Sequence, residues 1–151
     1  MKVTMLLADA AQAVDGKLYI LGGGWSIIGP APSAMAIAIK IDVPWTEANI
    51  THRLRLALFD EDEQPFRVPT DTGEQPFELH STFEVGRPPG LRPGTPLDLA
   101  LAINLLPLPL RSNSRYVWRC FINDETEEGW QASFSTRPDP AQSQLPPTPQ
   151  E

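Results

Sequence analysis

The chain has 151 residues, 41% hydrophobic and 21% charged, a balance typical of one folded domain rather than a disordered chain or a membrane-spanning bundle. Its 17 prolines and 10 glycines argue against long helices, because each proline removes a backbone hydrogen-bond donor. The formal net charge of −7, with arginines scattered among acidic neighbours, indicates that nucleic acid is not a partner, since a phosphate backbone requires a contiguous basic face.

Apolar and polar residues alternate with a period of two along most of the chain, which is the pattern of half-buried strands. Residues 35–43 show it clearly, with Ile37, Ile39 and Ile41 on one face and Lys40 on the other. The predicted strands span residues 3–9, 17–28, 35–43, 53–58, 77–85, 97–105, 116–122 and 130–134. The expected fold is an all-β antiparallel β-sandwich of about eight strands, immunoglobulin-like or related. A small closed barrel is the alternative, because both folds alternate inward and outward residues.

The first two predicted strands carry the most distinctive segments. Ala8-Asp9-Ala10-Ala11 is followed by the run from Asp15 to Trp25, which reads DGKLYILGGGW. These residues resemble the opening of a family of small uncharacterised bacterial proteins, a domain of unknown function, so the resemblance implies a bacterial setting and no mechanism. The glycines at 22–24 predict a bulge or a close backbone approach to the neighbouring sheet, since glycines inside a strand forfeit packing. A phosphate-binding loop is the alternative, but no predicted helix follows it.

Acidic residues in two loops are the candidate ligand site. Asp9 and Asp15 lie around the first loop, and Asp60 and Asp62 follow a later strand. Oxygen ligands from two loops at one end of a sandwich can hold a calcium ion, and the arrangement resembles synaptotagmin-type calcium-dependent lipid-binding sandwiches. Solvated turn carboxylates are the favoured interpretation, because Asp15-Gly16 is a standard hairpin signal and the resemblance fails outside these four positions. We therefore expect no cofactor, with calcium as the alternative. The corresponding alternative function is a β-sandwich that binds calcium or a small ligand through these acidic loops.

No convergent set of catalytic groups is recognisable in the sequence. Both histidines, His52 and His80, are expected at the surface. Cys120 is in phase with Trp118 and Ile122, which predicts a buried and unreactive thiol. One cysteine cannot form an internal disulfide, which favours a reducing, cytoplasmic compartment. We expect a protein that is not an enzyme, while an enzyme with an unfamiliar site is a further alternative.

The residues most suggestive of an interface are apolar. Trp45 is expected to be the most exposed of the four tryptophans. The strand at 97–105 is apolar on both faces, with Ala100, Ala102 and Leu106 opposite its inward leucines. Either a loop or a second subunit must cover that outer face, and we favour a subunit in a two-fold homodimer. The expected function is a cytoplasmic interaction or assembly module that binds protein, itself included.

The composition changes at Pro138, after which proline, glutamine and serine dominate. Such a segment cannot bury enough apolar area to offset its ordering entropy. We predict a β-sandwich domain at residues 1–137 and a disordered tail at 138–151. No apolar run reaches the roughly 18 residues of a membrane helix, so no membrane partner is expected.

Overall fold

The computed structural model describes residues 1–31 and 33–141, which form an all-β structure, as predicted. The strands are β1 (Lys2–Val14), β2 (Lys17–Gly23), β3 (Ile27–Ile28), β4 (Met35–Val43), β5 (His52–Asp60), β6 (Arg67–Thr70), β7 (Gly73–Pro76), β8 (Glu78–Phe83), β9 (Leu97–Leu105), β10 (Arg115–Ile122) and β11 (Gln131–Thr136). The helical content of the described ranges is one short 3-10 turn, η1 (Trp45–Glu47).

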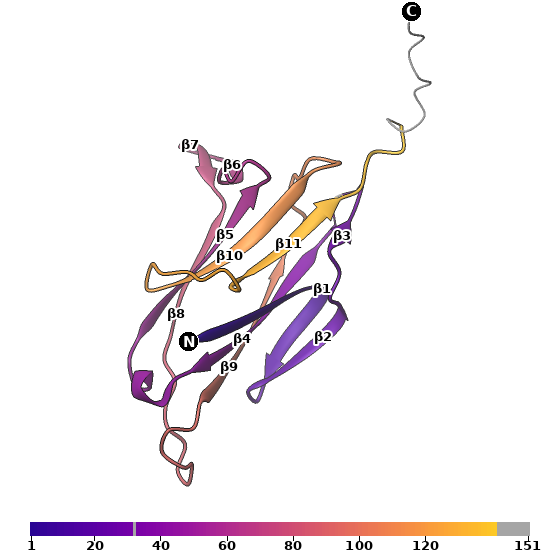
Figure 1. The fold of residues 1–151 in the computed structure, drawn as a ribbon. Coiled ribbons are helices and arrows are strands. Elements are labelled where there is room, and N and C mark those ends of the chain that lie inside the picture. The colour runs from indigo at the N-terminus through magenta and orange to yellow at the C-terminus, as the bar shows by residue number, and fades with distance from the viewer. Residues whose placement is uncertain (32, 142–151) are drawn as a thin grey trace, which may run out of the picture.

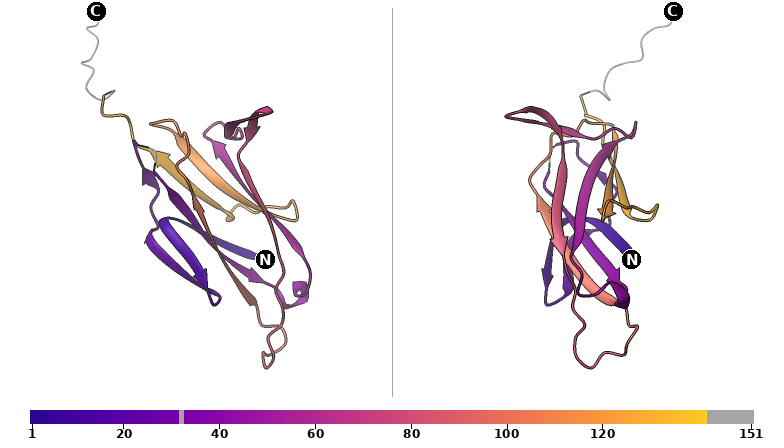
Figure 2. Two further views of the ribbon diagram at one scale, coloured as in Figure 1. Left: turned by 180° about the vertical axis from the view of Figure 1, so that it is seen from behind. Right: turned by 90° about the vertical axis from the view of Figure 1, so that its left-hand side faces the viewer.

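The strands form two larger sheets and one short one (Figure 1). The four-stranded sheet has the order β2-β1-β4-β9, the five-stranded sheet has the order β3-β11-β10-β5-β8, and β6 pairs with β7. All pairings are antiparallel except the short contact of β3 with β11. Both views of Figure 2 show the β8–β9 connection projecting beyond the strand ends.

The two larger sheets share one hydrophobic core. The four-stranded sheet contributes Leu7 and Ile39, and the five-stranded sheet contributes Leu56 and Trp118, each at most 2% exposed. These side chains lie on the inward faces that the alternation in the sequence predicts. Both larger sheets therefore contribute side chains to the same core.

The strand count differs from the expected eight at two places. The predicted strand at 17–28 is divided into β2 and β3, which belong to different sheets. The β6–β7 hairpin was not predicted, because its sequences RVPT and GEQP have no apolar alternation and each contains a proline. The last described strand, β11, ends at Thr136, close to the predicted domain end. Residues 142–151 of the predicted tail lie outside the described residues.

Strand β1 takes part in two pairings and changes its inward phase between them. Its first half, residues 2–8, pairs with β4, and residues 8–14 pair with β2. Leu7 and Ala8 are both buried, although adjacent residues of a regular strand point to opposite faces. Leu7 belongs to the main core and Ala8 belongs to a separate cluster, so the two halves of β1 contribute side chains to different hydrophobic clusters.

The second half of β1 and all of β2, residues 8–23, form a unit that we call the first hairpin. Ala11 of this hairpin is clustered with Ala36 and Ala38 of β4, and Ala102 of β9 packs against that cluster. The Ala11 N–H donates to Asn104 Oδ1 at 3.1 Å, and Asn104 Nδ2 donates to the Ala11 carbonyl at 2.8 Å. The first hairpin thus covers part of the outer face of β4 and β9, where the small alanines permit close approach.

The glycines of the first hairpin are required by its geometry. Gly22 has a φ of +60°, and a Cβ there would collide with the Asp9 carboxylate. A Cβ at Gly23 would collide with the Ile20 side chain. The close contacts at these glycines are with side chains of β1 and of β2 itself, and not with the neighbouring sheet that the sequence predicts. At the other end, Asp15 and Gly16 both have positive φ, which matches the predicted two-residue hairpin turn.

Candidate functional site

The four aspartates of the calcium alternative are not brought together. Figure 1 shows the β1–β2 turn, which holds Asp15, and the β5–β6 connection, which holds Asp62, at opposite ends of the molecule. Among residues 1–31 and 33–141, no three His, Cys, Asp or Glu side chains are grouped so as to hold a metal ion. Asp9 instead lies against Gly22. The two loops therefore do not place these four carboxylates in one cluster.

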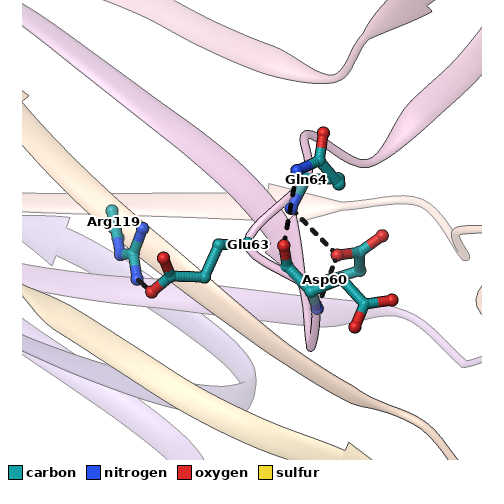
Figure 3. A network of polar contacts seen from close by, with 5 residues as sticks. Asp60, Glu63, Gln64 and Arg119 are labelled. Carbon is teal, nitrogen blue, oxygen red and sulfur yellow. Dashed lines mark hydrogen bonds and ion pairs between the residues drawn. The ribbon is translucent and has the colours of Figure 1, made fainter.

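The later acidic loop is organised by its own hydrogen bonds (Figure 3). Asp60 Oδ1 accepts the backbone N–H groups of Asp62 and Gln64, each at 2.9 Å. Glu63 Oε1 lies 3.1 Å from Arg119 Nη2, which ties the loop to β10. These contacts are those of a closed turn in which Asp60 is half-buried and Asp62 and Glu63 are exposed.

The two histidines have different environments, and the expectation of a surface position was wrong for His52. Its side chain is 3% exposed and stacks on Phe83 with ring centroids 5.1 Å apart. His52 Nε2 lies 2.9 Å from the Glu47 carbonyl oxygen, and Nδ1 lies 3.0 Å from Asn123 Nδ2. The period of two could have located it, because residue 52 is in phase with the inward residues of β5. His80 is exposed and lies 3.0 Å from Glu78 Oε2.

Cys120 is fully buried in β10, as its phase predicts. Burial raises the pKa of its thiol to about 12, because a thiolate there would be removed from water. The nucleophilic form of cysteine is the thiolate, which this burial disfavours at neutral pH.

The four predicted interface residues do not form one surface. Trp45 is half-buried, and the Arg87 guanidinium lies 4.8 Å from its ring centroid. Trp45 follows the end of β4 that pairs with Leu97, whereas Leu106 follows the opposite end of β9. Leu106 is 84% exposed, and Ala100 and Ala102 are half-buried. For Ala102, the covering loop that was the less favoured alternative is present, because the first hairpin packs over it.

A different apolar surface lies on the first hairpin. Val14, Tyr19, Ile20 and Leu21 are exposed, with Tyr19 at 57% and Leu21 at 71%. Leu18 packs into the alanine cluster, so Tyr19 and Leu21 point to the opposite, outer face of the hairpin. The sequence contained a signal for this surface: the run LYIL in β2 has no alternation, so both faces of the strand are apolar.

The outer face of the first hairpin carries no carboxylate, although the chain is strongly acidic. Cross-strand pairing places Ala10 beside Leu21 and Gln12 beside Tyr19. The charged group on this outer face is Lys17, at the start of β2. The outer face is therefore formed by Ala10, Gln12, Val14, Lys17, Tyr19 and Leu21.

The backbone of β2 also has unused hydrogen-bonding groups. Both backbone groups of Ala11 bind Asn104, which lies on the side of β1 away from β2. Ala11 faces Ile20, so this is a non-hydrogen-bonded pair of the ladder, and the Ile20 N–H and C=O point away from β1. The N–H and C=O of Leu18, two residues earlier in the strand, also point away from β1. In the described part of the chain β2 pairs with β1 alone, so these groups form an open edge.

Comparison with known proteins places the chain in a family. A family-level match spans residues 3–133, from β1 into β11. The chain belongs to DUF6941, a family of unknown function. The expected membership in a domain family of unknown function is thereby confirmed. No curated protein and no solved structure matches the chain.

This DUF6941 member protects its other sheet edges in ways that proteins commonly use. The edge strand β8 carries Glu78 and His80, and β3 is two residues long. The edge strand β9 lies between Pro96 and Pro107, and its Asp98 pairs with Lys40 at 3.1 Å. Charges, prolines and short strands all hinder strand addition. Within the described residues, the β2 edge is the least protected of the four ends of the two larger sheets, since its one charge, Lys17, lies at the start of the strand.

The described ranges contain no helix long and apolar enough to cross a membrane.

Proposed function

We propose that this protein is a non-enzymatic interaction module that binds another protein chain through the first hairpin. The observation that carries the proposal is the exposure of Tyr19 and Leu21 beside an open strand edge. Exposed apolar patches and unprotected edges are features of interaction sites in folded proteins. Burying an exposed side chain of this size contributes about 1.5–3 kcal/mol, which is a useful fraction of a binding energy.

The side chains that would most readily serve catalysis support a non-enzymatic function. Cys120 is buried, and burial raises the pKa of its thiol to about 12. His52 uses both ring nitrogens in contacts with Glu47 and Asn123. Neither group is in a state to act as a nucleophile or a base on a substrate.

The proposal includes a β-sandwich rather than a closed barrel. Within the described residues, each larger sheet has two end strands that are paired along one edge only. They are β2 and β9 in one sheet and β3 and β8 in the other. A closed barrel has no such ends. The proposed setting is a bacterial cytoplasm, supported by the single buried cysteine and by the resemblance of the opening segment.

Site-specific photo-crosslinking in the native host tests the proposed binding surface. A benzophenone amino acid at Leu21 of the full chain should capture a protein on irradiation. The same amino acid at Ile50, which is 49% exposed and lies outside the first hairpin, is the matched control. A product from Leu21 that is absent from Ile50 supports the proposal, whether the captured protein is another copy or a different chain. No product above the control would contradict it.

A further inference from the structure

We infer that the chain bound at the β2 edge is a second copy of this protein, with its own β2 paired antiparallel about a two-fold axis at Tyr19. This inference rests on the proposed function, because it names the partner of the same surface. Two-fold dimers are the commonest assemblies of soluble proteins, and their interfaces must be self-complementary. The β2 edge meets that requirement in its backbone, in its side chains and in its charge.

The backbone fixes the register. Residues 17–21 precede the positive φ of Gly22, and Tyr19 is their midpoint. A two-fold axis at Tyr19 places Leu18 opposite Ile20 of the second copy. Leu18 and Ile20 are the residues whose N–H and C=O groups point out of the edge, so each pair can exchange both hydrogen bonds. An axis at Ile20 would instead place Gly22 in the ladder, where its φ departs from the extended range.

The side chains fit the same register. Tyr19 faces Tyr19 of the second copy in a non-hydrogen-bonded pair, where side chains are closest and aromatic pairs are favourable. Leu21 lies opposite Lys17 of the second copy, whose aliphatic stem can cover it. Tyr19 is 57% exposed and Leu21 is 71% exposed in one copy. In the dimer these side chains and those of the second copy form one continuous apolar surface across the axis.

Charge and rigidity favour a second copy as well. Each chain carries −7, yet residues 17–23 contain no carboxylate, so the two acidic chains meet where no like charges are opposed. The first hairpin is already held by Asn104 and by the alanine cluster. A strand that is ordered before binding loses little conformational entropy on association. The product is one continuous sheet made from both four-stranded sheets.

Disulfide trapping on the full chain tests both the partner and the register. Tyr19→Cys should form a disulfide-linked dimer under mild oxidation about tenfold faster than Ile50→Cys, because pairing raises the local thiol concentration. Mixed Lys17→Cys and Leu21→Cys chains should crosslink to each other faster than either does alone. The native Cys120 does not compete, because it is buried. Circular dichroism of each reduced variant checks that it is folded.

Each result has a definite meaning. Rapid trapping of Tyr19→Cys, together with a dimer of the wild-type chain in sedimentation, supports the inference. Rapid trapping of Leu21→Cys alone, with slow Tyr19→Cys, overturns the register. Two results together overturn the second copy as partner: a wild-type chain that is monomeric at a concentration on the order of 100 µM, and disulfide trapping of Tyr19→Cys no faster than that of Ile50→Cys. In that last case a different protein captured at Leu21 by photo-crosslinking would still support the proposed function, so the two failures are distinguishable.

Discussion

The strands β2 and β8 are both ends of larger sheets, and they lie on opposite sides of the molecule (Figure 1). They differ in the side chains that they expose to solvent. On β8, Glu78 bonds both Arg55 and His80, and Ser81 and Thr82 are exposed. On β2 the exposed residues include three large apolar side chains, Tyr19, Ile20 and Leu21, and one charged side chain, that of Lys17 at the start of the strand. One edge is protected by charge and polarity, and the other is apolar and open.

The difference shows that an open edge is not a general consequence of this fold. A protein that protects β8 could protect β2 by the same means, because charged residues are easily placed on an edge strand. The glycines at 22 and 23 and the Asn104 clamp instead hold β2 in a defined position. The comparison predicts that changes near β2 divide into those that move the strand and those that alter only its surface.

The largest expected effect is from Gly22→Ala, which moves the strand. An alanine at a φ of +60° is strained, and its Cβ would meet the Asp9 carboxylate. The free energy of unfolding should fall by about 2–3 kcal/mol, mainly from backbone strain, with a smaller contribution from displacing the exposed Asp9 carboxylate. Gly16→Ala is the control, because its φ is also positive but its Cβ would meet no atom. Urea unfolding that gives equal losses for both variants would contradict the proposed collision.

Asn104→Ala should have the next largest effect, because it removes the clamp between β9 and the first hairpin. Both Ala11 backbone groups lose their partner, which reduces the free energy of unfolding by about 1–3 kcal/mol. Asn104→Asp is the matched variant, since a carboxylate accepts from the Ala11 N–H but cannot donate to its carbonyl. Its stability should be intermediate in urea unfolding. A neutral Asn104→Ala would show that the hairpin is held by the alanines alone.

The sequence predicted those parts of the fold that depend on local patterning. Strands β4 and β9 alternate regularly, and the Asp15-Gly16 turn has the residues that positive φ requires. Cys120 was correctly placed inside by its phase. The covering of Ala102 was less predictable, because it depends on Asn104 binding Ala11, which is 93 residues away in the chain.

The candidate site was missed for a related reason. The run LYIL in β2 is apolar on both faces, which is compatible with a strand buried on both sides as well as with an exposed edge. Deciding between them requires the sheet order, and the phase change between Leu7 and Ala8 that folds the first hairpin outward is not marked by a proline. The acidic loops were the predicted ligand site instead, because clustered charges are visible in a sequence whereas the separation of two loops in space is not.

A smaller effect is expected at the protected edge. Arg55 pairs with Glu78 at 3.1 Å and its guanidinium lies 3.8 Å from the Phe121 ring centroid. Arg55→Met should lower the free energy of unfolding by about 1 kcal/mol, because this pair is only partly exposed. Arg53→Met is the control, since Arg53 pairs with Asp124 at a far more exposed position. Equal losses in urea unfolding would indicate that the Arg55 contacts add nothing specific.

The smallest effect on the folded monomer is expected from Tyr19→Thr combined with Leu21→Thr. Both side chains point to solvent, and threonine suits a strand, so the free energy of unfolding of the monomer should change by no more than about 0.5 kcal/mol. Association should nevertheless be lost. The melting temperature of the wild-type chain should rise with protein concentration, because a dimer that forms only from folded chains stabilises them by mass action. The melting temperature of the double variant should be independent of concentration and should equal the dilute wild-type value. A variant that kept the concentration dependence would show that the chains associate elsewhere, with the exposed Leu106 as the next residue to replace.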